Sequence, residues 1–299
     1  MIRRNRKLPQ GLAIAAQSAE FWRRLAPDLT ISDGQPLSAI QRHPGQAAED
    51  RLRLINDGYL HLKSPGIAVD LSAISDALER IVVAGLPASF IGVYDETWAI
   101  IAQLEAVLGG LLDGKAAMVP NFHADHLGSD SQGRLAARQR PANSLFRDKS
   151  PKSVNVWVPL TDATPDNGCV YAVPAGQDRN YGAKKPERAD ASLPSIRALP
   201  AGAGDVLIWT GETYTWQGRP NPRSGAPATL MSLSWEFQST ETAAFEGLTI
   251  DSYPYVPFET RLGLLAHQMP GHTSGFSSNP LWRAVQQTLS NRYPMNSPG

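Results

Sequence analysis

Two amphipathic helices are predicted in the first half of the chain. Residues 70–84 start at an aspartate, which commonly caps helices, and end before Gly85. Apolar side chains recur there at helical spacing, at Leu71, Ile74, Leu78, Ile81 and Val82. Residues 95–112 carry a similar stripe of Trp98, Ile101, Leu104, Val107, Leu108 and Leu111. Each helix therefore has one face to bury.

After residue 115 the pattern changes to short apolar or alternating runs separated by Pro, Gly, Asn and Asp, which is typical of antiparallel sheet. Six strands are predicted, at residues 116–125, 154–160, 169–173, 205–209, 214–217 and 229–237. The motif TPDNG at 164–168 predicts a tight hairpin between two of them. Helical spacing returns at 259–268 and 281–289, whereas residues 1–50 look irregular.

This order of elements predicts an α+β fold, mainly β, in which helices buttress a β-sandwich or barrel. We assign the 299 residues to a single domain with three parts. These are an irregular N-terminal extension at 1–55, a core of helices and barrel at 56–240, and a C-terminal helical extension at 241–299.

Charge and hydropathy exclude several partners. With 28 basic and 28 acidic residues the formal net charge is zero, so no global field attracts nucleic acid or an anionic membrane surface. The longest mostly apolar stretch, residues 98–112, is interrupted and shorter than the roughly 20 residues of a membrane span. No signal-peptide cleavage site follows the basic start. We expect a cytoplasmic protein with a small-molecule partner, and the sequence leaves the oligomeric state open.

Few residues could bind a metal. The single cysteine, Cys169, excludes an internal disulfide and any multi-cysteine metal site, so metal ligands would have to be histidine and carboxylate. The six histidines are His43, His61, His123, His126, His267 and His272.

Two long motifs resemble one family. Residues 154–176 read VNVWVPLTDATPDNGCVYAVPAG and residues 201–225 read AGAGDVLIWTGETYTWQGRPNPRSG. They are similar to motifs of the phytanoyl-CoA dioxygenase family of Fe(II)/2-oxoglutarate oxygenases. The resemblance extends to DGYLHL at 57–62 and MSLSWEFQ at 231–238, and so covers most of residues 55–240. It implies a double-stranded β-helix, the jelly-roll barrel of cupin-like proteins.

The family's iron ligands are mostly missing. The resemblance implies a facial triad of two histidines and a carboxylate, with the distal histidine near Thr215 or Trp216. The sequence has no histidine between His126 and His267. Neither an alcohol nor an indole can replace a neutral imidazole as an iron ligand, so the usual triad cannot form.

The expected oxoglutarate cation is also missing. The resemblance places it around residues 228–230, but no lysine or arginine lies between Arg223 and Arg261. A buried carboxylate without a cationic partner is unfavourable. Arg219 or Arg223 could reach in from the preceding turn, although turn arginines are more often solvated. We therefore predict neither Fe(II) nor 2-oxoglutarate as a cofactor.

The proximal His-x-Asp motif has two possible registers. In one, His123 and Asp125 in NFHADH form the pair. In the other, GRLAARQRP at 133–141 occupies the motif's place, about 20 residues before Trp157, and Ala137 and Gln139 replace the ligands. We favour the second register, in which all three iron ligands and the oxoglutarate cation have been lost.

His123 and Asp125 are the leading catalytic candidates. Strand alternation puts Asn121, His123 and Asp125 on one face, where an imidazole and a carboxylate form an acid/base pair. Glu212 is a second catalytic candidate, because Trp209, Tyr214 and Trp216 surround it in sequence. We predict substrate contacts from Asn121, His126, Arg138, Trp157, Trp209, Tyr214 and Trp216.

Three function classes remain at this point. The first is a repurposed, metal-independent enzyme that performs isomerisation, cyclisation, elimination or hydrolysis on a small hydrophobic substrate. The second is an Fe(II)/2-oxoglutarate dioxygenase that uses His123, Asp125 and a non-standard ligand such as Glu212. The third is a catalytically inactive binding or partner protein.

Overall fold

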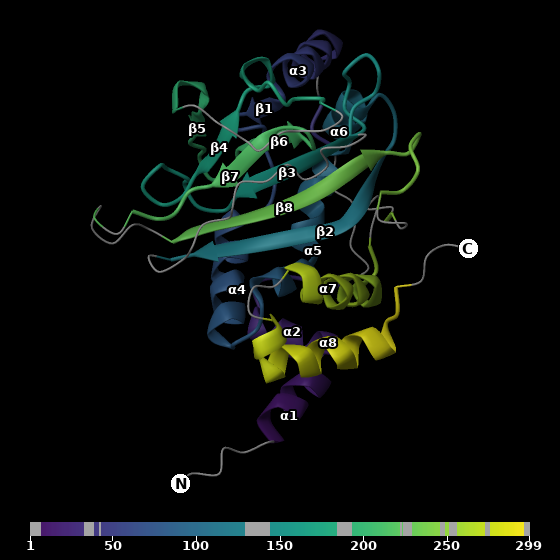
Figure 1. Ribbon diagram of the computed structural model, residues 1–299. Coiled ribbons are helices and arrows are strands. Elements are labelled where there is room, and N and C mark those ends of the chain that lie inside the picture. The colour runs from purple at the N-terminus through teal and green to yellow at the C-terminus, as the bar shows by residue number, and fades with distance from the viewer. Residues whose placement is uncertain are drawn as a thin grey trace.

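Two antiparallel β-sheets face each other, and helices cover the outer side of the larger sheet (Figure 1). The computed structural model describes residues 7–32, 39–41, 43–128, 144–183, 193–221, 223, 229–245, 249–250, 256–272 and 276–295. Sheet A has the strand order β1-β6-β3-β8-β2, and sheet B has the order β5-β4-β7. This is the jelly-roll architecture that the sequence predicts.

The strands agree closely with the sequence pattern. All six predicted strands form, and two short strands, β1 and β5, were not predicted. The strands are β1 (Tyr59–Leu62), β2 (Ala116–Leu127), β3 (Ser153–Pro159), β4 (Val170–Val173), β5 (Arg197–Leu199), β6 (Val206–Thr210), β7 (Tyr214–Gln217) and β8 (Leu230–Ser239). Strand β1 has four residues and β5 has three.

Eight α-helices lie in the described part of the chain. They are α1 (Lys7–Ala15), α2 (Ala19–Leu25), α3 (Pro44–Asp57), α4 (Leu71–Val83), α5 (Asp95–Gln103), α6 (Glu105–Leu112), α7 (Phe258–His272) and α8 (Pro280–Arg292). The predicted cap of α4 is confirmed, because the Asp70 carboxylate accepts from the N–H groups of Ser72 and Ala73. Gly85 follows with a φ of 78°, a left-handed conformation that favours glycine.

The predicted helix over residues 95–112 is interrupted at Leu104. The carbonyl of Gln103 accepts a hydrogen bond from the N–H of Ile40 at 2.7 Å. This tertiary contact competes with the helical hydrogen bond that the carbonyl would otherwise accept from Val107. The apolar stripe was predicted correctly, but its division into α5 and α6 depends on a residue distant in sequence.

The prediction of an irregular N-terminal segment was wrong for the described residues, which form α1, α2 and α3. Trp22 of α2 is fully buried, stacks on Phe90 with ring centroids 5.2 Å apart, and donates its indole N–H to the carbonyl of Ala16. Helices α1 and α2 have nine and seven residues, too few for a clear period, and packing against the core stabilises them.

The TPDNG motif does not form a hairpin, contrary to our prediction. It connects β3 of sheet A to β4 of sheet B, and these strands do not pair with each other. The carbonyl of Thr164 accepts from the N–H groups of Asn167, Gly168 and Cys169. A Cβ atom at Gly168, which has a φ of 101°, would lie 2.7 Å from the carbonyl oxygen of Gly218. The motif is therefore a tight turn between the two sheets.

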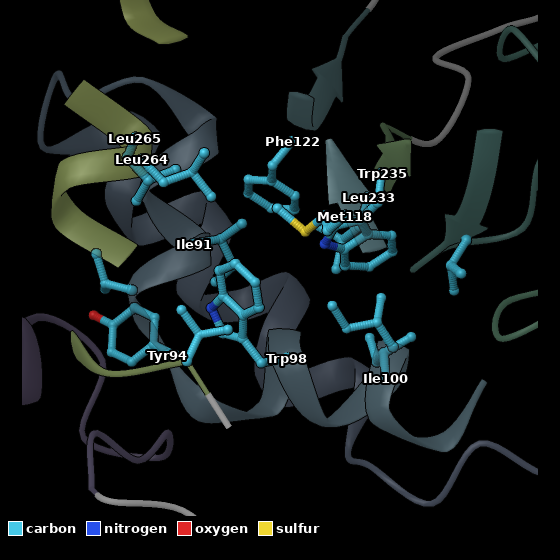
Figure 2. Packing of buried hydrophobic residues seen from close by; sticks show 14 of the residues in the cluster. Ile91, Tyr94, Trp98, Ile100, Met118, Phe122, Leu233, Trp235, Leu264 and Leu265 are labelled. Carbon is cyan, nitrogen blue, oxygen red and sulfur yellow. The ribbon is translucent and has the colours of Figure 1, made fainter. Parts of the chain in front are cut away.

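The largest apolar core lies between sheet A and the helices. Phe122 of β2 points toward Ile91 and the α7 residue Leu265 (Figure 2), and its ring centroid lies 5.5 Å from that of Trp235 of β8. A second apolar cluster lies between the two sheets and includes Trp157, Leu207, Trp209, Leu230, Val170, Ala172 and Leu199. Alternate residues of sheet A therefore face either the helices or sheet B. Among the described helices, none has the length and apolar character needed to cross a membrane.

The Asp205 carboxylate links the edge strand β1 to the rest of sheet A through hydrogen bonds. The carboxylate accepts from the N–H groups of Ser64 and Gly202 and is 2.9 Å from Nε2 of His61. Burial alone would raise the pKa of Asp205, but these hydrogen bonds outweigh burial and hold the pKa below its usual value.

We expect Asp205→Asn to lower the free energy of unfolding by about 1 to 3 kcal/mol at neutral pH, because charged hydrogen bonds are lost. A carboxylate with a depressed pKa stabilises the fold above its unfolded pKa of 3.8, and this contribution is lost as pH falls through the folded pKa. The difference from wild type should therefore shrink below about pH 4. Urea denaturation at several pH values measures this difference in the free energy of unfolding.

Asp76→Asn, on the exposed face of α4, is the matched control and should change stability by less than about 0.5 kcal/mol. An equal difference at pH 3 and pH 7 would contradict the assignment.

Candidate functional site

The face of sheet A that looks toward sheet B, called here the inner face, carries an unusual number of polar side chains. In β8, Leu233, Trp235 and Phe237 belong to the core under the helices. Because side chains alternate along a strand, Ser232, Ser234, Glu236 and Gln238 lie on the inner face. All four of these polar residues are buried.

The structure brings Asn121, His123 and Asp125 together on the inner face of β2, as the alternation predicts. His123 pairs with Ser234 and Asp125 with Ser232 across the β2–β8 ladder. The Ser232 hydroxyl donates to Oδ2 of Asp125 at 3.2 Å. His123 and Asp125 are both half-buried.

A bulge in β2 shapes this site. Val119 lies opposite Glu236 and His123 opposite Ser234, so β2 holds two extra residues between these pairs. The Gln268 side chain of α7 accepts from the N–H of Phe122 and donates to its carbonyl, which satisfies the backbone where it leaves the ladder. An insertion of two residues preserves the alternation, so Asn121 remains on the inner face.

Glu236 and Asn155 are site residues that our sequence analysis missed. Glu236 is 1% exposed and accepts from Nδ2 of Asn121 at 2.8 Å. Asn155 of β3 lies between Glu236 on one side and Trp209 on the other. Both residues interrupt apolar runs, in VNVWV and SWEFQ, and this is the signal that could have identified them.

Glu212 is buried at the connection between β6 of sheet A and β7 of sheet B. It is 2% exposed, and Oε1 accepts from the hydroxyl of Ser144, which is fully buried, at 2.9 Å. The structure thus places Glu212 inside the protein at the end of the β6 strand.

The aromatic candidates divide between two surfaces. Trp157 and Trp209 lie on the inner face of sheet A, within the apolar cluster between the sheets. Tyr214 and Trp216 alternate with the inward residues of β7, and Trp216 stacks on Tyr171 with ring centroids 5.6 Å apart. Tyr214 and Trp216 therefore lie on the outer face of sheet B, away from the inner face.

Two further predicted substrate contacts are not part of this group. His126 lies on the opposite face of β2, where Nε2 contacts the carboxylate of Glu79 on α4. Arg138 is outside the described residues, as are Ala137 and Gln139.

Three residues that the sequence analysis discussed in connection with iron and oxoglutarate can be placed in the structure. Thr215 is buried and pairs with Ala172, whose side chain is in the apolar cluster between the sheets, so Thr215 faces inward. Arg219 and Arg223 are exposed. Across the described ranges, no three His, Cys, Asp or Glu side chains are grouped closely enough to hold a metal ion.

Cys169 is not a candidate nucleophile. It is completely buried between the sheets, and burial raises the pKa of its thiol to about 11. The reactive form of cysteine is the thiolate, which is scarce at neutral pH when the pKa is this high.

Comparisons with known proteins agree with the observed fold. Residues 119–221 match the family model of phytanoyl-CoA dioxygenase (PhyH). EctD from S. alaskensis, solved with 2-oxoglutarate and 5-hydroxyectoine, superimposes with a TM-score of 0.52 and 13% identity over 71% of this chain and 85% of EctD. EvdMO1 gives a TM-score of 0.50 and 13% identity over 65% of this chain and 50% of EvdMO1. The carbocyclase SnoK from nogalamycin biosynthesis gives 0.49 and 16%, over 69% and 87% of the two chains. No curated protein matches the sequence.

Proposed function

We propose that this phytanoyl-CoA dioxygenase-like protein is an enzyme that works without iron and oxoglutarate, and that it performs acid/base chemistry on a small hydrophobic substrate. Isomerisation, cyclisation, elimination and hydrolysis are the reactions open to such a site. The observation that carries the proposal is the placement of His123 and Asp125 together on the polar inner face of sheet A.

The donor set supports a role without iron. A facial triad needs three nitrogen or carboxylate donors around one point. Thr215, at the position of the distal histidine, offers only a hydroxyl, which is a poor iron ligand. The residues of the inner face therefore do not suit a two-histidine, one-carboxylate iron site.

The charges on the inner face also argue against oxoglutarate. Strand β8, where the resemblance places the cation, contains no lysine or arginine. Its inner face carries the buried carboxylate of Glu236 instead. A dicarboxylate bound against β8 would find no cationic partner on that strand, which is unfavourable for a buried carboxylate.

His123 and Asp125 can act on the same substrate. Side chains two residues apart on a strand are separated by about 7 Å, so a small molecule on the inner face can contact both. His123 can take or give a proton near neutral pH, and Asp125 supplies a second acid/base group that Ser232 orients. Trp157, Leu207 and Leu230 make the neighbouring part of this face apolar.

The test is incubation of the purified protein with Fe(II), 2-oxoglutarate and oxygen. Loss of one imidazole removes a primary ligand, and outer-shell changes alone reduce metal affinity by about 10 to 100-fold. We expect substoichiometric iron by elemental analysis and no succinate above the protein-free background. One iron per chain together with catalytic succinate release would favour the dioxygenase alternative.

A further inference from the structure

The bulge in β2 determines where His123 lies along β8. Residues 120–122 lie opposite a single residue of β8, Trp235, and regular pairing resumes with His123 opposite Ser234. Without the two extra residues, in what is called here the unbulged register, His123 would lie opposite Ser232 instead. Two residues of a strand span about 7 Å, so the bulge sets the position of His123 along the inner face by that distance.

Burial of the apolar side chains does not select between these two registers. A shift of one residue would move every side chain of β2 to the opposite face, but a shift of two residues leaves each one on the same face. Phe122 would therefore point toward the helices, and His123 and Asp125 toward sheet B, in either register. Some other interaction has to stabilise the bulge.

The side chain of Gln268 on α7 is bonded to the bulge itself. Its oxygen accepts from the N–H of Phe122 at 2.9 Å, and its nitrogen donates to the carbonyl of the same residue. Gln268 is only 5% exposed, so solvent cannot replace these partners. In the unbulged register the backbone of Phe122 would return to the ladder with β8, and the buried amide of Gln268 would lose both partners, which is unfavourable.

The helix that carries Gln268 is held firmly in place. The guanidinium of Arg261, also on α7, is fully buried and donates to the carbonyl of Val93 at 3.0 Å and to Oδ1 of Asp95 at 2.6 Å. Charge-assisted hydrogen bonds of this kind are strong, and they fix α7 against the start of α5. Gln268 therefore reaches the bulge from a rigid support.

We infer that Gln268 is a positioning residue, which selects the bulged register of β2 by bonding to the backbone of Phe122. In this register Ser232 lies opposite Asp125, and its hydroxyl donates to that carboxylate at 3.2 Å. In the unbulged register Ser232 would face His123 instead. The catalytic consequence rests on the proposed function, because that function acts through His123 and Asp125.

Gln268→Met tests this role, because methionine has a similar length but no amide. The readout is the set of nuclear Overhauser contacts between backbone protons of β2 and β8 in the NMR spectrum. We expect His123 to lose its contact with Ser234 and to gain one with Ser232. Turnover should fall at least about 10²-fold, since displacing a catalytic group by 1 Å can already cost that much.

Leu264→Ala is the matched control on the same helix. Leu264 is fully buried in the core beneath sheet A, so its truncation should lower the melting temperature. It leaves the amide of Gln268 intact, so the contact between His123 and Ser234 should remain and turnover should stay within a few-fold of wild type. A role of Gln268 in stability alone would make the two variants behave alike.

Hydrogen exchange of the wild type tests the same bond without a variant. The N–H of Phe122 donates to a buried side chain, so it should exchange at least about 10³-fold more slowly than an unprotected amide. This measurement also decides the matter if Gln268→Met does not fold.

An undiminished contact between His123 and Ser234 in Gln268→Met, or a wild-type Phe122 amide that exchanges as fast as an unprotected one, would overturn the inference. Neither readout needs a substrate. A changed register with unchanged turnover would instead support register selection by Gln268 and count against catalysis by His123 and Asp125, so the two failures are distinguishable.

Discussion

Replacing His123 by alanine, or Asp125 by asparagine, should lower turnover by about 10² to 10⁴-fold while the protein stays folded, which is the usual contribution of general acid/base catalysis. Both side chains are half-buried on the inner face of an edge strand, so neither replacement leaves a large cavity. The measurement is substrate conversion followed by mass spectrometry in metal-free buffer, with thermal melting as the check on folding.

Thr215→Ala is the matched control for these two variants. Thr215 is also buried and faces the space between the sheets, but it has no group that transfers protons at neutral pH. Its turnover should stay within a few-fold of wild type. If the His123 and Asp125 variants are silent, these residues are structural and Glu212 becomes the next catalytic candidate.

Restoring the family's ligands should create an iron site. In the favoured register the ligand positions are Ala137, Gln139 and Thr215, so the variant is Ala137→His, Gln139→Asp and Thr215→His combined. We expect its Fe(II) affinity to exceed that of wild type by at least about 10²-fold, since three primary ligands are added and outer-shell changes alone are worth 10 to 100-fold. Anaerobic Fe(II) titration by calorimetry measures the change.

Thr215→His alone distinguishes the two registers. If His123 and Asp125 were the original pair, this one substitution would complete a triad with them. In the favoured register it supplies a single ligand and should raise affinity little. Tight iron binding by the single variant, with no further gain from the other two substitutions, would show that His123 and Asp125 occupy the ligand positions.

Most helices and strands of this fold could be predicted from local sequence patterns. A helix or strand that buries one face carries apolar residues at a regular spacing, and this spacing is visible in the sequence. The apolar stripe of 70–84 and the alternation of 229–237 each mark a face that has to be covered, and both elements form. The turn at Thr164 was recognised as a turn, but its partner strands were not. Pairing depends on residues distant in sequence, and here the chain passes from one sheet to the other.

The candidate site was predicted only in part for the same reason. His123 and Asp125 share a face because they lie two residues apart, which the sequence shows directly. Glu236 and Asn155 come together because β3 and β8 are neighbours in sheet A. No local sequence pattern shows that these two strands pair. Trp216 was expected near the substrate, but alternation in β7 places it on the outer face of sheet B.

The most direct test of metal-independent acid/base catalysis is the turnover of wild-type protein that has been treated with a strong chelator and passed into metal-free buffer. We predict the same rate before and after treatment, with no gain on adding Fe(II) and 2-oxoglutarate. Loss of turnover on chelation, with recovery when Fe(II) is returned, would contradict it.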